Sequence, residues 1–103
     1  MDPKRILAPA ETADALARTA FVHDGDRLEA AYRTPDFAGA VRVLDAVAPV
    51  ADELDHHPDV RLGWGRVVFE LSSHDVGGVT SRDLELAQRI DVLAVAAGAQ
   101  RAE

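Results

Sequence analysis

Residues 60–72 read VRLGWGRVVFELS, and this stretch decides the fold that the sequence predicts. From residue 66 onward, apolar and polar side chains alternate. One face would carry Val67, Phe69 and Leu71, and the other Arg66, Glu70 and Ser72. A period of two indicates a strand that is buried on one side only. Residues 60–63 form a shorter candidate strand, and Gly65 marks a turn or bulge between the two.

A second hairpin is predicted nearer the N-terminus. Residues 20–23 and 27–33 are its candidate strands, and Asp24-Gly25-Asp26 lies between them. Asp-Gly supplies the positive φ that a tight hairpin turn requires. We expect His23 to be a surface residue of this turn.

Two helices precede the stretch at 60–72. The first covers residues 9–18. The second begins with Thr34 as the N-cap and Pro35 at the first helical position, and it ends before His56. Pro49 predicts a kink or break in it near residue 45, because proline lacks an N–H and crowds the carbonyl four residues earlier.

The last helix starts at a capping box, in which Thr80 is followed three residues later by Asp83. Gly98 is its expected C-cap. The element order is therefore α-β-β-α-β-β-α within a single domain, residues 1–103. Hairpins without a βαβ repeat predict an α+β fold, with a four-stranded antiparallel sheet and helices packed on one face.

The charge balance excludes several classes of partner. The chain has 11 basic and 18 acidic side chains, a net charge of -7, whereas nucleic acids and anionic membranes attract basic surfaces. It has no cysteine, so disulfides, thiolate metal sites and cysteine nucleophiles are excluded. No apolar run approaches the ~20 residues of a membrane span, and the N-terminus lacks a signal-peptide core. We expect a cytoplasmic protein.

Three of the four histidines lie near predicted turns, as His56-His57-Pro58 and as His74 after the best strand. Histidine exchanges protons near neutral pH, so such a set is a candidate acid–base site. Pro58 favours an extended His57, and neighbouring side chains of an extended chain point to opposite sides. We therefore expect the two rings to diverge. The alternative is that they are loop histidines that favour the C-terminus of a helix.

The nearby residues allow more than one interpretation. Asp83 is explained by capping alone, although a role in a pocket is compatible with it. Asp55 and Asp75 would either orient a histidine ring or remain solvated loop acids. A metal site is disfavoured because the i, i+4 histidine spacing is absent. Trp64 is expected to pack in the core or against another subunit.

The residues Asp52, His56-His57-Pro58, Trp64, His74 and Asp83 together resemble the signature of the pterin-4α-carbinolamine dehydratases, also called 4a-hydroxytetrahydrobiopterin dehydratases. That signature runs from an acidic or polar residue through His-His-Pro, an aromatic residue and a third histidine to an aspartate. The resemblance extends over roughly residues 28–93. The family often has a tryptophan after its first helix, where this chain has Phe21.

The resemblance implies a reaction and its residues. A 4a-hydroxytetrahydropterin would lose water to give the quinonoid dihydropterin, as a step in tetrahydrobiopterin-type cofactor recycling. Catalysis would be by acid and base groups, without a metal or cofactor. His56, His57 and His74 would be catalytic, with His57 mainly placing the substrate. The implied pterin contacts are Asp55, Pro58, Ser73, Asp75, Val76 and Asp83. A homo-oligomer, dimer or tetramer, is also implied.

Two other functions remain open on the same resemblance. One is a non-catalytic dimerisation or coactivator-type binding module. The other is a dehydratase of another pterin pathway, such as molybdopterin metabolism. Retention of all three histidines favours an enzyme.

Overall fold

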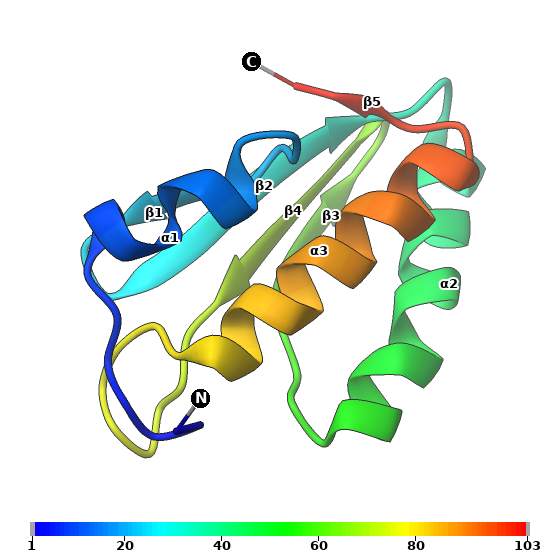
Figure 1. Cartoon of the computed structure of the whole chain (residues 1–103). Helices are drawn as coiled ribbons and strands as arrows, with labels where there is room; N and C mark the ends of the chain where they lie inside the picture. The colour runs from blue at the N-terminus through cyan, green and yellow to red at the C-terminus, as the bar shows by residue number, and fades with distance from the viewer. Residues whose placement is uncertain (1, 103) are drawn as a thin grey trace.

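The computed structural model describes residues 2–102, and Figure 1 shows its helices lying on one side of a single sheet. The elements in chain order are α1 (Pro9–Leu16), β1 (Val22–Asp24), β2 (Arg27–Arg33), α2 (Phe37–Leu54), β3 (Asp59–Gly63), β4 (Arg66–Leu71), α3 (Ser81–Ala96) and β5 (Gln100–Arg101). The predicted α+β class and element order are confirmed. No helix within the described residues is long and apolar enough to cross a membrane.

The sheet has the strand order β1-β2-β4-β3, and every pair is antiparallel. The described residues contain a fifth strand, so the predicted count of four was too low. This strand, β5, pairs with Tyr32 and Arg33 of β2. Two residues are too few to show an alternating pattern, which is why the sequence did not reveal it.

The core lies between the sheet and the helices. The predicted core face of β4 is confirmed, since Val67, Phe69 and Leu71 are buried. On the opposite face Arg66 is exposed but Val68 is also buried, so the alternation is incomplete. Leu28, Ala30 and Tyr32 are their buried counterparts in β2. The Tyr32 and Phe69 rings meet edge to face, with their centroids 6.1 Å apart. The other face of the sheet carries charged side chains and has no helix over it (Figure 1).

Helix α2 begins later than predicted. The Asp36 carboxylate accepts a hydrogen bond from the Gly39 N–H at 2.7 Å, so Asp36 is the N-cap and Phe37 the first helical residue. The prediction of Thr34 as cap and Pro35 at the first position was wrong. Thr34 instead donates its hydroxyl to the Asp36 carbonyl at 2.8 Å.

Pro49 does not interrupt α2, which is continuous from Phe37 to Leu54. The predicted break near Asp45 was therefore wrong. Asp45 and Pro49 are both exposed, so water can hydrate the carbonyl that lacks a helical donor. The buried face passes beside the proline through Val47 and Ala51.

Helix α3 starts at the predicted capping box and ends one residue earlier than expected. Thr80 is the N-cap, and Asp83 accepts a hydrogen bond from the Thr80 N–H at 2.8 Å. Ala97 is the C-cap, and Gly98 follows with φ of +92°, a conformation that suits glycine.

A buried carboxylate on α3 joins three parts of the fold. Asp91 accepts hydrogen bonds from Tyr32 at 2.7 Å, from the Ala20 N–H at 3.1 Å and from Arg101 at 2.7 Å. Burial alone would raise the pKa of Asp91, but these hydrogen bonds outweigh it and hold the pKa below its usual value. Burial and the contact with Asp91 raise the pKa of Tyr32, which therefore stays neutral. Asp91 thereby holds β2, β5 and the loop before β1 on α3.

Candidate active site

The two adjacent histidines diverge as the sequence predicts. Helix α2 ends at Leu54, and its C-cap Asp55 has a left-handed backbone (φ 50°) that turns the chain before His56. The His56 ring turns inward, and its Nε2 lies 2.6 Å from Asp83 Oδ1. The His57 ring lies at the surface, with Nε2 2.9 Å from Asp52 Oδ1. The two rings therefore have different partners and different access to solvent.

Asp83 is at once a helix cap and the partner of His56. Its side chain is 0% exposed. Oδ2 accepts from the Thr80 N–H and from Ser73 Oγ, each at 2.8 Å, while Oδ1 contacts His56. Ser73 Oγ is also 2.8 Å from Thr80 Oγ1. Capping was predicted from sequence, but the pairing with His56 spans 27 residues of chain and was not.

This arrangement fixes the tautomer of His56. An ionised carboxylate only accepts hydrogen bonds, so His56 Nε2 is the donor in the contact with Asp83. In the neutral ring Nδ1 then keeps its lone pair. Because Nε2 is engaged by Asp83, Nδ1 is the ring nitrogen left to accept a proton, and the His56 side chain keeps 11% of its surface exposed.

His74 lies in the loop between β4 and α3. Its neighbour Ser73 forms an isolated bridge with Gly78, and Gly77 between them has φ of +73°, so the predicted turn is confirmed. The His74 side chain is 80% exposed, and its Nε2 lies 4.0 Å from Asp59 Oδ2. Asp59 begins β3, two residues after His57. His74 therefore lies near the start of β3, whereas His56 and His57 have other partners, Asp83 and Asp52.

The other predicted contact residues belong to the segments 55–59 and 73–83, which meet at one corner of the molecule through the His56–Asp83 and Asp59–His74 contacts. Asp75 pairs with Arg82 at 2.8 Å, and this hydrogen bond lowers the pKa of Asp75. The Val76 N–H donates to the Ser73 carbonyl at 3.1 Å, and Pro58 is half-buried. Asp55 is exposed at the end of α2. Ser73 and Asp83 are fully buried, so their polar atoms contact protein rather than a ligand surface.

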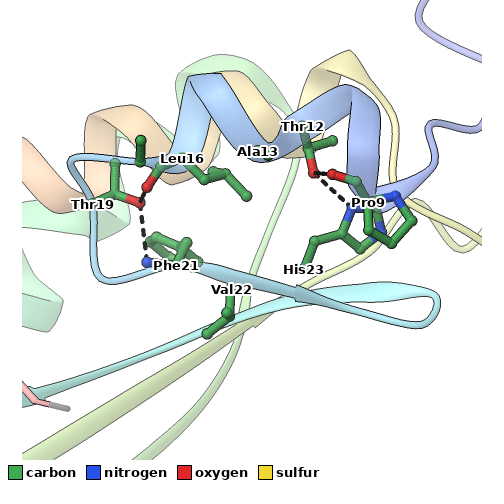
Figure 2. Close-up of a pocket in the computed structure, with 9 residues that line it drawn as sticks. Pro9, Thr12, Ala13, Leu16, Thr19, Phe21, Val22 and His23 are labelled. Carbon is green, nitrogen blue, oxygen red and sulfur yellow. Dashed lines mark hydrogen bonds between the residues drawn. The ribbon is translucent and has the colours of Figure 1, made fainter.

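His23 lies apart from this corner. A cavity of about 380 Å³ lies between α1 and β1, lined by Pro9, Leu16, Phe21 and their neighbours, and Figure 2 shows His23 reaching across to Thr12. His23 Nδ1 is 2.8 Å from Thr12 Oγ1. The expectation of a surface turn residue was wrong, because β1 turns this half-buried ring towards α1. Phe21 is a buried member of the core.

Trp64 does not pack in the core. It lies in the turn between β3 and β4, and its side chain is 75% exposed. The two-residue turn holds it beyond the end of the hairpin, so core packing, one of the two expectations, was wrong.

Histidines and carboxylates do not converge on a metal-binding geometry in the part of the chain that the structure describes. His56 and His57 each contact a single aspartate, and those aspartates differ.

The comparisons with known proteins agree with the signature. The sequence model of the family described as Pterin 4 alpha carbinolamine dehydratase matches residues 6–93. A relative from Thermosynechococcus vestitus, provisionally named pterin-4-alpha-carbinolamine dehydratase, is 39% identical over 90 residues, which are 86% of this chain and 95% of the relative. A relative from Saccharolobus solfataricus with the same provisional name is 44% identical over 72 residues, 70% of this chain and 74% of the relative.

Solved structures share the fold. A protein from Brucella melitensis, described as a transcriptional coactivator/pterin dehydratase, superposes with a TM-score of 0.80 and 26% identity, covering 87% of this chain and 99% of that one. A pterin dehydratase-like protein, described as a RuBisCO assembly factor in the alpha-carboxysome, gives a TM-score of 0.62 at 24% identity, covering 75% and 92% of the two chains. The second likeness concerns the fold alone.

Proposed function

The chain belongs to the pterin 4 alpha carbinolamine dehydratase family, and on that basis we propose that it dehydrates 4a-hydroxytetrahydropterins to quinonoid dihydropterins. The observation that carries this proposal is the corner where the segments 55–59 and 73–83 meet: the buried Asp83 holds His56, and His74 lies 4.0 Å from Asp59. The wider proposal includes recycling of a tetrahydropterin cofactor in the cytoplasm.

The reaction requires two proton transfers. An acid protonates the hydroxyl on C4a, which leaves as water, and a base removes the proton from N5 as the double bond forms. Histidine performs both roles near neutral pH. We assign proton transfer to His56, through Nδ1, and to His74, and we assign substrate placement mainly to His57. Pro58 and the loop at 73–76 would contact the pterin ring.

The test is direct. The 4a-carbinolamine is generated enzymatically and its dehydration is followed spectroscopically with and without the protein. The proposal expects acceleration well above the spontaneous rate, with saturation in the carbinolamine. A rate equal to the spontaneous one at micromolar protein would refute the dehydratase function.

Asp83→Asn tests the role of the buried carboxylate. The asparagine oxygen can still accept from the Thr80 N–H, but its amide then presents an N–H to His56 Nε2. His56 would switch tautomer and lose the lone pair on Nδ1. We expect kcat to fall by about tenfold or more with little change in KM, since general acid–base groups contribute ~10²–10⁴-fold. The imidazole ¹⁵N shifts of His56 would report the switch.

The matched control is Glu11→Gln. Glu11 caps α1 as Asp83 caps α3, accepting from the Ala8 N–H at 2.9 Å, and contacts no histidine. The Glu11→Gln variant should leave kcat unchanged. An Asp83→Asn protein with full kcat, or with unchanged His56 shifts, would show that the carboxylate is only a cap.

A binding module is the second candidate function. Val92 and Val95 of α3 are exposed, and a groove of about 300 Å³ beside them is lined partly by Val50 and Leu93. Exposed apolar side chains of this kind suit a protein contact.

We also propose that the protein forms a homo-oligomer, either a dimer or a tetramer. Sedimentation equilibrium would measure the mass of this assembly. A binding module without catalysis would give the expected mass but no acceleration of dehydration.

A further inference from the structure

A second group of charged residues lies beside His74 on the sheet face that has no helix over it. A cavity of about 170 Å³ opens there. It is lined by Asp26, Arg27, Asp59, Glu70, Leu71, Ser72, His74 and Gly77. Its volume is that of several water molecules, enough for one end of a bicyclic ring rather than the whole substrate. One side of the cavity is therefore formed by His74, a proposed catalytic residue. The other side is a polar wall, to which the proposed reaction assigns no role.

Glu70 is the oriented carboxylate of this wall. It lies on β4, two residues before Ser72 and on the same face, which puts the two about 7 Å apart along the strand. Arg61 donates to Glu70 Oε1 at 3.0 Å, and that hydrogen bond lowers the pKa of Glu70. The Arg61 hydrogen bond uses Oε1, and the facing Glu29 carboxyl on β2 also lowers the pKa of Glu70. An ionised, pre-oriented carboxylate therefore keeps accepting capacity at the cavity.

Arg27 supplies a cation on the same wall. Its Nε is buried and has no hydrogen-bond partner within the described residues. The nearest carboxylates are Glu29 at 3.6 Å and Glu70 at 3.9 Å, too far for a good hydrogen bond. The enclosed Nε cannot reach a ligand, but the Arg27 side chain as a whole is 43% exposed and lines the cavity, so the terminal nitrogens of the guanidinium are the donors that a ligand can meet there.

We propose that Glu70 and Arg27 bind the pyrimidine edge of the pterin in this cavity. This edge presents the 2-amino group and N3–H as adjacent donors, which match the two oxygens of a carboxylate, and O4 as an acceptor for a guanidinium. The C4a–N5 edge then lies towards His74, and the C6 substituent extends out of the small cavity. Asp59 is the weaker candidate for the carboxylate, because it is largely exposed and faces His74. The inference rests on the proposed dehydratase function and specifies the residues that select its substrate.

Binding of stable ring analogues tests it without turnover. The probes are a 7,8-dihydropterin and the corresponding 2-oxo compound, a 7,8-dihydrolumazine, titrated by calorimetry or fluorescence. The wild type should bind the 2-amino compound at least about tenfold more tightly, because the 2-oxo group faces a carboxylate. Glu70→Gln should weaken dihydropterin binding about tenfold and remove most of the preference. In turnover, Glu70→Gln should raise KM more than it lowers kcat.

Glu29→Gln is the matched control. Glu29 pairs with Glu70 across β2 and β4 and lies 3.6 Å from Arg27 and 3.9 Å from Arg61, but it does not line the cavity. This variant should bind both probes as the wild type does. If Glu70→Gln keeps the wild-type preference, or if Glu29→Gln loses as much, the recognition proposal is overturned while dehydration by the wild type can stand. If the wild type neither binds the dihydropterin nor dehydrates the carbinolamine, the proposed function itself fails.

Discussion

His74→Ala is expected to lower kcat/KM for the 4a-carbinolamine by about 100-fold, within the ~10²–10⁴-fold range of a positioned acid or base. The side chain is mostly exposed, and its one ionic contact, with Asp59, is 4.0 Å long. The substitution therefore removes a proton-transfer group without opening a cavity in the core. Dehydration kinetics and thermal unfolding, measured on the same sample, should give a large loss of rate and an unchanged Tm.

His23→Ala is the matched control for that loss. His23 contacts Thr12 on α1, away from the corner that carries the other histidines. This variant should keep its rate and lose stability by about 1–2 kcal/mol, because the ring hydrogen-bonds both Thr12 Oγ1 and the Gly25 carbonyl. If His74→Ala retained wild-type kcat/KM, the assignment of His74 to proton transfer would be wrong. Equal losses of rate in both variants would point to a general effect of removing histidine.

Asp91→Ala is expected to lower the free energy of unfolding by about 3 kcal/mol or more, the range for breaking a buried hydrogen-bonded charge. The change removes the acceptor for the Tyr32 hydroxyl, the Ala20 N–H and Arg101. Tyr32 is fully buried, so its hydroxyl would have no replacement partner among the described residues. Urea unfolding would measure the loss. Tyr32→Phe removes the buried hydroxyl itself, so no unpaired donor is left behind. It should lower the free energy of unfolding by only about 1 kcal/mol.

The same carboxylate makes stability depend on pH in one direction. The folded pKa of Asp91 lies below its unfolded value. Its contribution is therefore fully present above the unfolded pKa of about 4 and is lost as the pH falls through the lower folded pKa. The difference in stability between wild type and Asp91→Asn should shrink as the pH falls below about 4. A difference that stays constant down to pH 2 would contradict this linkage.

The fold could be predicted largely because its main signals are local. The strand at 27–33 and the alternation of β4 follow from side-chain period, and the capping box follows from a three-residue spacing. Helix boundaries were harder to predict. Thr34 and Asp36 both suit an N-cap, and only the contact with Gly39 distinguishes them.

The candidate site could be predicted only in part. Pro58 was enough to predict that His56 and His57 diverge. The partners of the rings were not predictable, because Asp83 lies 27 residues after His56 in the chain and Asp59 lies 15 before His74. The same is true of Asp91, which reads as an ordinary polar residue of α3 until Tyr32 and Arg101 are brought to it.

The double role of Asp83 makes the first turn of α3 a reporter of the catalytic corner. The Thr80 amide and the His56 ring share one carboxylate, so fraying of this turn would also release the ring. Hydrogen exchange at the Thr80 amide should then follow the fraction of molecules with an ordered His56. On warming, dehydration should decline with that exchange before the sheet unfolds, so inactivation would be a local event that precedes global melting.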